Sequence, residues 1–170
     1  MKIFAISDLH LPGMQDKPMD VFGDNWKNHW EKIKKNWVEL ISPKDIVLIP
    51  GDISWAMKLD EALVDLDQIA DLPGRKVLVK GNHDYWWSSI TRLRESTHPS
   101  IYAIQNDCLK FEDIPELAFC GTRGWTSPGT KDFTSHDEKI FNREFNRLKL
   151  SLDDAKDCSN IIVLLHFPPF

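Results

Sequence analysis

An α/β fold with parallel strand pairing is predicted by the distribution of apolar residues along this sequence. Four short runs are almost entirely apolar, as is typical of strands covered on both faces of a sheet: residues 3–6, 46–49, 77–79 and 161–165. Longer segments between them carry an apolar residue at every third or fourth position, which is the period of an amphipathic helix. The 170 residues show no internal repeat and no low-complexity linker, so we expect a single domain over residues 1–170.

The helical patterns follow the first three strands and precede the last one. They predict helices over residues 25–41, 59–72, 88–96 and 137–155. The second of these ends at Pro73 and Gly74, a pair that stops helices. In the last one, a single apolar face is formed by Ile140, Phe141, Phe145, Leu148 and Leu152. We therefore expect its basic side chains to be solvated: Lys139, Arg143, Arg147 and Lys149.

The stretch after Pro99 first shows short apolar runs in place of long helical patterns. The runs 101–104, 109–111 and 117–120 are predicted to be short strands of a meander, because turn residues separate them. A loop rich in Gly, Ser, Thr and Pro follows and leads into the last helix.

Composition and charge are those of an ordinary globular protein and argue against a nucleic-acid-binding or a membrane-spanning protein. Apolar residues make up 42% and charged residues 28%, and the net charge is −5. This mild acidity gives no strong signal for nucleic-acid binding, which normally requires a basic face. The sequence has no stretch long enough to span a membrane, and the N-terminus does not resemble a signal peptide. The three cysteines have no short spacing and are expected to be reduced thiols, so a cytoplasmic protein is predicted, with its oligomeric state left open.

Each of the four apolar strands runs directly into side chains that commonly bind metal ions. In chain order these are Asp8 and His10, then Asp52, then Asn82 and His83, and finally His166. The carboxyl ends of strands in an open α/β sheet converge on one edge, so we expect these side chains to meet in one crevice. Asp8 and His10 are two positions apart and would point to the same side of an extended segment. Gly51 and Gly81 precede polar groups and would allow a close backbone approach.

The chemistry of these ligands favours certain metals. Oxygen and nitrogen ligands without thiolates suit manganese, iron or zinc better than calcium or a structural zinc site. Two divalent ions about 3.5–4 Å apart can clamp both the attacking and the leaving oxygen of a phosphoryl displacement. Asp52, near the middle of the cluster, is suited to bridge two ions. Asn82 adds a neutral ligand, which leaves positive charge to attract an anionic substrate.

In order and in position, these motifs closely resemble the calcineurin-like metallophosphoesterase family. The family pattern of Asp-x-His, Gly-Asp, Gly-Asn-His-Asp/Glu and a lone His is found here as DLH, GD, GNHD and His166. Each motif alone is weak or moderate evidence, but all four in order, over essentially the whole chain, are strong evidence. The resemblance implies an α/β/β/α sandwich of two mixed sheets flanked by helices. It also implies hydrolysis of a phosphate mono- or diester, with a small molecule or a nucleotide as the substrate.

The resemblance further implies a role for each motif residue. The metal ligands would be Asp8 and His10 for the first ion, Asp52 as the bridge, and Asn82 and His166 for the second ion. His83 would protonate the leaving oxygen, and Asp84 would orient the ring of His83. The nucleophile would be a metal-bound hydroxide, because a metal can lower the pKa of bound water from about 15.7 to about 7.

One family motif, Gly-His-x-His, is absent from this sequence. The chain ends at LLHFPPF, so the last two histidine ligands and the strands that close the second sheet are expected to be missing through truncation. A fragment of this kind would bind metal more weakly, be weakly active or inactive, and expose apolar surface. The alternative function is a scaffold or protein-binding subunit that keeps the fold and has lost catalysis. The intact GNHD argues against this alternative, and the absent Gly-His-x-His argues for it.

Several other residues allow both a functional and a structural interpretation. Arg123, on a flexible loop, could clamp a substrate phosphate or be an exposed structural arginine. Trp86 and Trp87 could stack on a planar group, although core packing is the favoured interpretation, and Trp55 carries the same ambiguity. The remaining histidines are expected to be solvated: His29, His98 and His136.

Overall fold

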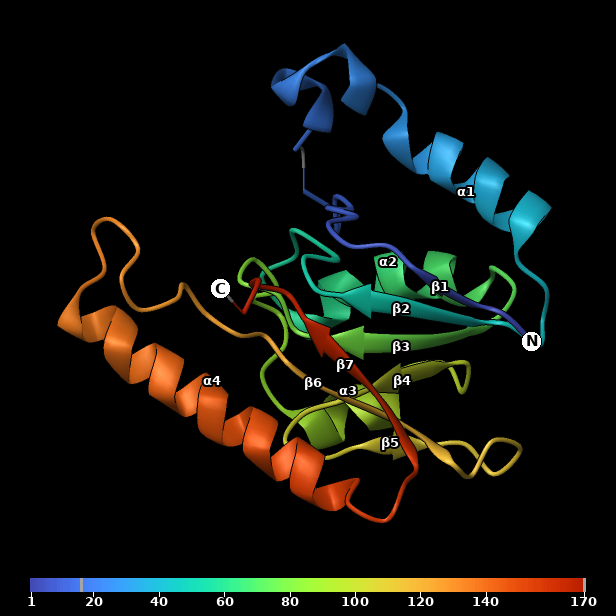
Figure 1. Ribbon diagram of the computed structural model, residues 1–170. Coiled ribbons are helices and arrows are strands. Elements are labelled where there is room, and N and C mark those ends of the chain that lie inside the picture. Colours follow the sequence, from blue (N-terminus) through green and yellow to red (C-terminus); the bar gives the residue numbers. More distant parts are fainter. Residues whose placement is uncertain (16, 170) are drawn as a thin grey trace.

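The computed structural model describes residues 1–15 and 17–169, and in these ranges two β-sheets pack face to face between helices (Figure 1). The first sheet is wholly parallel and has the order β1 (Ile3–Ala5), β2 (Ile46–Pro50), β3 (Arg75–Val79) and β4 (Ile101–Ala103). The second has the order β5 (Leu109–Lys110), β6 (Leu117–Thr122) and β7 (Asn160–Leu165). Here β5 is antiparallel to β6, and β7 is parallel to it. The predicted α/β fold is confirmed, with one sheet parallel rather than mixed.

The helices lie close to their predicted positions. They are α1 (His29–Leu40), α2 (Leu59–Ala70), α3 (Ile90–Ser96) and α4 (Ser135–Asp154), and the short 3₁₀ turns η1 (Met19–Phe22) and η2 (Asp24–Trp26) precede α1. Helix α1 begins four residues later than predicted, because Asn28 adopts a left-handed conformation with a φ of 54°. Across the described ranges, every helix is too short or too polar to cross a lipid bilayer.

Apolar side chains cover both faces of the first sheet. On one face, Val47, Ile49 and Leu78 pack against apolar residues of α1, α2 and α3. On the other face, Ile46, Leu48 and Val77 pack against the second sheet. Burial on both faces explains why the strands of this sheet read as nearly continuous apolar runs. The favoured interpretation of Trp86 and Trp87 is confirmed, because both belong to the core on the helical side.

Two expectations about strand partners are wrong. The run 101–104 was expected in a meander, but β4 pairs in parallel with β3, because the intervening α3 carries the chain back to the same end of the sheet. The strand predicted over 161–165 was expected to share an edge with the first three, but β7 pairs with β6 in the second sheet. His166, which follows β7, therefore approaches from a different sheet than the other predicted ligands.

The side of helix α4 that covers the outer face of the second sheet is more polar than predicted, although Leu152 of the predicted apolar face packs against the core there. The buried residues of α4 are Glu144 and Ser151, whereas Phe145 is 59% exposed. The Ser151 hydroxyl accepts a hydrogen bond from the backbone N–H of Gly121 at 3.1 Å and donates one to the carbonyl of Asp107 at 2.5 Å. Polar partners on the sheet and its loops therefore decide which side of α4 faces inward.

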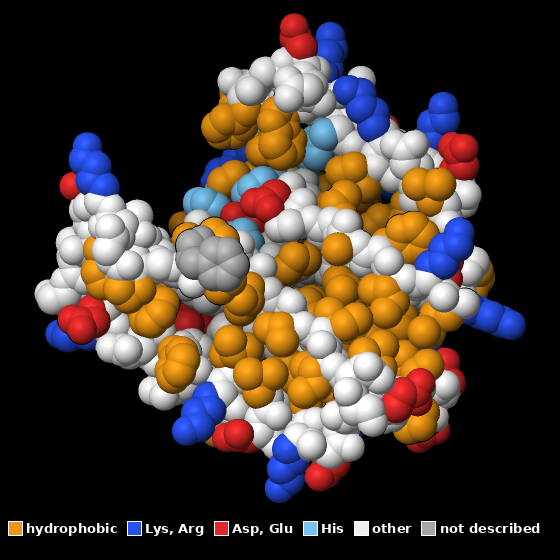
Figure 2. Space-filling view, viewed as in Figure 1, with side chains coloured by type: hydrophobic (Ala, Val, Ile, Leu, Met, Phe, Trp, Pro, Cys, Tyr) orange, Lys and Arg blue, Asp and Glu red, His pale blue; other side chains and the backbone are white. Residues whose placement is uncertain are grey.

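The outer side of β7 leaves apolar side chains accessible. Figure 2 shows hydrophobic side chains gathered over the part of this face where β1, β2 and β7 lie. On β7, Ile161 and Val163 are 40% and 43% exposed, while Ile162 and Leu164 point between the sheets. Histidine and carboxylate side chains gather next to this apolar surface in the same view.

Candidate metal centre

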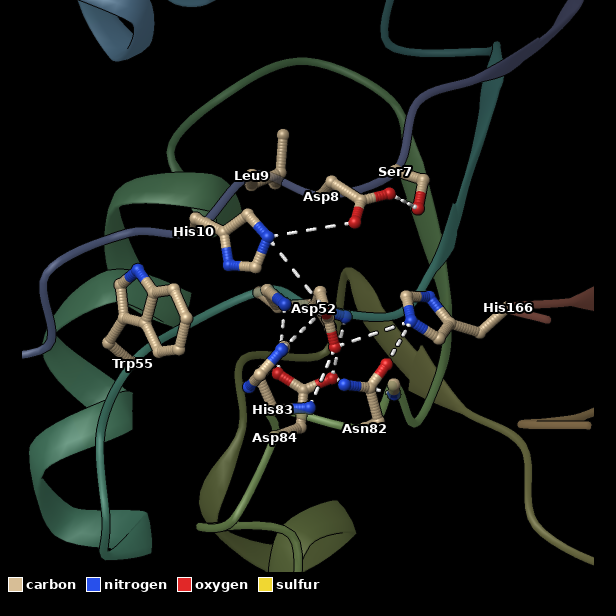
Figure 3. Close-up of polar contacts among 12 residues, drawn as sticks. Ser7, Asp8, Leu9, His10, Asp52, Trp55, Asn82, His83, Asp84 and His166 are labelled. Carbon is tan, nitrogen blue, oxygen red and sulfur yellow. Dashed lines mark hydrogen bonds and ion pairs between the residues drawn. The ribbon is translucent and has the colours of Figure 1, made fainter. Parts of the chain in front are cut away.

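The loops that follow β1, β2 and β3 meet at the carboxyl edge of the first sheet (Figure 3). The backbone N–H of Asp8 donates to the carbonyl of Gly51 at 3.2 Å. The N–H of His10 donates to the carbonyl of Asp52 at 3.0 Å. The first loop is therefore attached along its length to the second, which places the first predicted ligands beside Asp52.

Three of the predicted ligands have a left-handed backbone. The φ angles of Asp8, His10 and Asp52 are 57°, 46° and 52°. Residues with a Cβ atom adopt this region at a cost, although Asp and His tolerate it better than most. The expectation that Asp8 and His10 lie on an extended segment is therefore wrong. The curled backbone still brings them together, with His10 Nε2 at 3.6 Å from Asp8 Oδ1.

The close backbone approach predicted at Gly51 and Gly81 is confirmed. Gly51 has a φ of 95°, and a Cβ atom on it would lie 2.5 Å from the Cα of Gly81. A Cβ atom on Gly81 would lie 2.2 Å from both the backbone N and Oδ1 of Asp52. Any side chain at either position would separate the second loop from the third.

Asp84 is buried at the junction of these loops and holds them together. Its carboxylate accepts hydrogen bonds at 2.8–3.3 Å from the backbone N–H groups of Gly81, Asp52, Ile53 and Ser54 and from the indole of Trp86. Burial raises the pKa of Asp84, and the backbone donors oppose this rise. The carboxylate thus satisfies backbone donors that the loops would otherwise leave unpaired.

The contacts of Asp84 differ from those of a carboxylate that orients the ring of His83, so this expected role stays a prediction. All the hydrogen bonds that its carboxylate accepts come from backbone and indole donors. Within the described part of the chain, the buried Nδ1 of His83 has no hydrogen-bond partner. Asp84 thus acts on the loops that carry the site, and among the described residues its carboxylate makes no hydrogen bond with the imidazole of His83.

Asp52 lies at the centre of the cluster with its two carboxylate oxygens turned in different directions. Oδ2 is 3.7 Å from Nε2 of His10, and Oδ1 is 3.5 Å from Nε2 of His166. These separations are too long for hydrogen bonds and suit atoms that share a cation. Burial lowers the pKa of His10, partly offset by Asp52 and Asp8, and so favours the neutral ring that binds metals.

His166 completes the other side of the cluster. Its Nδ1 lies 2.9 Å from the carbonyl of Pro50, which can only accept, so Nδ1 carries the proton of the neutral ring. The lone pair of Nε2 then points toward Asn82 Oδ1 at 2.7 Å and Asp52 Oδ1 at 3.5 Å. Converging lone pairs repel one another unless a cation lies among them. A ring N–H bound to a backbone carbonyl is also the usual support of a metal-ligating histidine.

All five predicted metal ligands are therefore brought together, and their chemistry fits divalent metal ions. Ligand atoms of Asp8, His10 and Asp52 lie within 4.8 Å of one another. Asn82 and His166 present an oxygen and a nitrogen on the other side of Asp52. The Pro50 carbonyl that supports His166 leaves no signal in the sequence, because it is a backbone group.

Trp55 is a site residue whose role the sequence left open. Its ring stacks on His10, with centroids 4.7 Å apart and planes 20° apart. The same ring lies 4.8 Å from the ring of His83. Trp55 thus packs against two site histidines and not in the core with Trp86, and its place three residues after Asp52 was the available signal.

The remaining candidates lie outside the cluster. His29, expected to be solvated, is half-buried, with its Nε2 at 2.9 Å from the carbonyl of Leu9. His98 and His136 are exposed, as predicted. Arg123 is not an exposed arginine, because its side chain is mostly buried, ion-paired with Glu144 and stacked on Trp125.

Comparison with known proteins identifies the family. The family model described as calcineurin-like phosphoesterase matches residues 1–170. The chain belongs to this family. Metal-dependent phosphoester hydrolysis is the activity of the family, and the Asp8, His10 and Asp52 group is a candidate metal site of this chain.

Two further similarities are more distant. The chain is 35% identical over 78 residues to the Gene 66 protein of Mycobacterium phage L5, a match that covers 46% of this chain and 37% of the phage protein. It is also similar to a solved structure titled "The Crystal Structure of the Protein of Unknown Function AQ665 from Aquifex aeolicus". That likeness has a TM-score of 0.49 and 19% identity, and covers 99% of this chain and 82% of the other.

Proposed function

We propose that this protein hydrolyses a phosphate mono- or diester with the help of two divalent ions, which are manganese, iron or zinc. The observation that carries the proposal is the position of Asp52, whose two oxygens face His10 and His166 on opposite sides. Asp8 and His10 would hold one ion, Asn82 and His166 the other, and Asp52 both. When bound, such ions lower the pKa of a coordinated water toward 7 and offset the negative charge of the phosphoryl group.

His83 is the general acid in this proposal. Its side chain is 36% exposed, so it can meet a substrate, and its Nε2 lies 4.0 Å from Asp52 Oδ2. That separation leaves Nε2 free to turn toward a leaving oxygen and deliver a proton to it. The backbone N–H of His83 donates to Asp52 Oδ1 at 2.8 Å, which fixes the acid relative to the bridging ligand.

The central experiment compares Asp52→Asn with His83→Ala in a manganese-dependent assay on aryl phosphate mono- and diesters. We expect Asp52→Asn to abolish metal-dependent turnover and to lower the amount of bound metal. We expect His83→Ala to keep its metal and to slow cleavage by about 10²–10⁴-fold, most severely for poor leaving groups. His98→Ala, at an exposed histidine outside the site, is the matched control.

Two results would change the proposal. If His83→Ala lost its metal as completely as Asp52→Asn, His83 would be a ligand and not the acid. If the unaltered chain bound metal but cleaved neither class of ester, the catalytically inactive scaffold would be favoured instead.

The proposal extends to the cellular compartment and to the kind of substrate. Cys108, Cys120 and Cys158 are all free thiols, as expected in the reducing cytoplasm. Burial raises the pKa of Cys108 to about 12 and also raises that of Cys120, so these thiols are poorly reactive. A small phosphate ester or a nucleotide stays the predicted substrate. The single domain over residues 1–170 also stays a prediction.

A further inference from the structure

A cavity of about 250 Å³ lies where the ends of β3, β4 and β6 face helix α4. Among the described residues that line it, the positively charged ones are Lys80, Arg123, Arg143 and Arg147, and Glu144 is the single carboxylate. None of the proposed metal ligands lines this cavity. Four cations against one anion form a strongly basic pocket in a protein whose net charge is −5.

Glu144 does not neutralise these cations. One of its carboxylate oxygens, Oε2, accepts a hydrogen bond from the Thr122 hydroxyl at 2.6 Å. The other oxygen, Oε1, lies 2.9 Å from Arg147, 3.4 Å from Arg123 and 3.6 Å from Arg143. A single oxygen is thus shared by three guanidinium groups. The pocket therefore keeps a substantial excess of positive charge.

The cations of the pocket are partly removed from water and repel one another. Burial lowers the pKa of Arg123, Glu144 partly offsets this, and the charges of Arg143 and Arg147 lower it further. The buried Nε of Arg123 has no hydrogen-bond partner within the described ranges. Bringing an anion into the pocket would relieve the repulsion and give this donor a partner.

We propose that this pocket binds an oxyanion, such as a phosphate group, between the guanidinium groups of Arg123, Arg143 and Arg147 and the ammonium group of Lys80. Planar guanidinium groups match the oxygens of a phosphate in charge and in geometry. The Lys80 ammonium donates one hydrogen bond to the carbonyl of Trp87 at 3.0 Å, and it has further N–H groups for a ligand.

The pocket adjoins the metal centre along the chain. Lys80 directly precedes Gly81 and Asn82. The carbonyl of Arg123 accepts hydrogen bonds from the backbone N–H groups of His166 at 3.1 Å and Phe167 at 2.9 Å. Two sources can therefore supply the oxyanion: a second anionic group of the ester that the metal centre cleaves, or a free anion. The first source rests on the proposed function, whereas the second does not.

Direct binding is tested by titrating the full chain with inorganic phosphate while its thermal unfolding midpoint is followed. The titration is made on the metal-loaded protein and again with a chelator. The comparison distinguishes phosphate bound by the metal ions from phosphate bound in the pocket. The variant Arg143→Gln/Arg147→Gln removes two pocket cations. The control Lys139→Gln/Lys149→Gln removes the same charge from exposed positions of the same helix that do not line the pocket.

We expect phosphate to raise the midpoint of the unaltered chain and of the control, with and without chelator. In the pocket variant, phosphate should bind at least about tenfold more weakly. Equal phosphate dependence in all three proteins would overturn the proposal and leave the arginines as partners of Glu144 only. If the double variant does not fold, Arg143→Gln alone makes the same decision, because Arg143 is 55% exposed and leaves the Arg147–Glu144 ion pair intact.

The source of the oxyanion is decided by kinetics on the metal-loaded chain. We compare the KM for an aryl phosphate with that for a nucleoside 3′,5′-bisphosphate. If the substrate supplies the oxyanion, the ratio of the two KM values changes about tenfold in the pocket variant and not in the control. If a free anion is bound, the ratio stays the same while phosphate binding is still lost. Absence of all turnover would contradict the proposed function alone, since the titration does not depend on it.

Discussion

The first sheet supplies Asp8, His10, Asp52 and Asn82 to the metal centre, whereas the second sheet supplies His166 alone. The loops of the first sheet are joined by backbone hydrogen bonds and by the buried carboxylate of Asp84. His166 is placed by the carbonyls of Pro50 and Arg123, and so by the packing of one sheet on the other. The comparison indicates that one half of the centre is fixed by local loop contacts and the other half by packing between the sheets.

The largest effect is expected when the support of the first half is removed. In Asp84→Asn, an amide NH₂ group would face backbone N–H donors that now bind a carboxylate. We expect the free energy of unfolding to fall by about 3 kcal/mol, because buried donors lose a charged acceptor. Metal-dependent turnover should be lost as well, since the loops carry the ligands. Urea denaturation and the ester assay measure the two effects.

Asp45→Asn separates stability from function in this test. The carboxylate of Asp45 accepts backbone hydrogen bonds from Lys2 at 2.6 Å and Ser42 at 2.9 Å, next to the opposite end of β2. These bonds hold the pKa of Asp45 at about 2, so the carboxylate stabilises the protein above the unfolded pKa and stops doing so as the pH falls toward 2. Asp45→Asn should lower stability at pH 7 without abolishing turnover. If it abolished turnover too, Asp84 would have no specific link to the site.

A smaller effect is expected from Gly51→Ala, which tests how closely the loops must approach. The new Cβ atom would lie 2.5 Å from the Cα of Gly81. Gly129→Ala is a matched control, because Gly129 has a φ of 90°, close to the 95° of Gly51, with nothing within 4 Å of its added Cβ atom. We expect a loss of about 3 kcal/mol at most for Gly51 and about 1 kcal/mol for Gly129. If denaturant unfolding shows equal losses of unfolding free energy in the two variants, backbone strain alone, and not the close approach to Gly81, explains the loss at Gly51.

The contribution of the second sheet is tested by His166→Ala. This change removes the one ligand that β7 delivers and leaves Asp8, His10 and Asp52 unchanged. We expect the metal content, measured by elemental analysis, to fall from two ions to one, with at least a tenfold weaker affinity for the ion that is lost. His136→Ala, at an exposed histidine, should keep both ions. Loss of both ions would show that the two halves depend on each other.

The smallest effect on the candidate metal centre is expected from Lys76, which lies near the amino end of β3 and away from the centre. Its ammonium is buried and donates to the carbonyls of Ala70 at 3.0 Å and Leu72. Burial lowers the pKa of Lys76 to about 8, so between pH 8 and about 10.5 the unfolded chain holds a proton that the folded chain has lost. Stability of the unaltered chain should therefore rise with pH through this window, by about 3 kcal/mol.

Lys76→Met should remove this rise, as measured by urea unfolding at a series of pH values. A slope of the opposite sign, or the same slope in both proteins, would contradict the assignment to Lys76.

The sequence was sufficient to predict most of the elements and which side chains gather in one cluster, because strand ends and metal-binding residue types are local features. Sheet membership was not predictable in the same way. The apolar run of β7 looks the same whether its neighbour is β3 or β6, since an apolar run does not specify its partner strand. His166 was nevertheless assigned to the right cluster, because both sheets direct their carboxyl ends to it.

Contacts with the backbone explain the sequence-based errors. The donors that bind Asp84 are mainly N–H groups of a different loop, and no residue type at positions 52–54 indicates them. The inward side of α4 is likewise set by Thr122 and by the backbone of Gly121. Arg143 and Arg147 lie near Glu144 in the sequence, and this charge pattern was the available signal for buried polar residues on α4. The prediction followed the hydrophobic periodicity instead.

The left-handed backbone at Asp8, His10 and Asp52 implies a trade-off between stability and function. Each of these residues costs the folded state about 1 kcal/mol that glycine would not. Judged by folding alone, Asp8→Gly would therefore be an improvement, even though it deletes a proposed metal ligand. In the proposed function, this strain holds the ligand atoms in position before an ion binds, and selection for a more stable chain would act first against the residues of the candidate metal site.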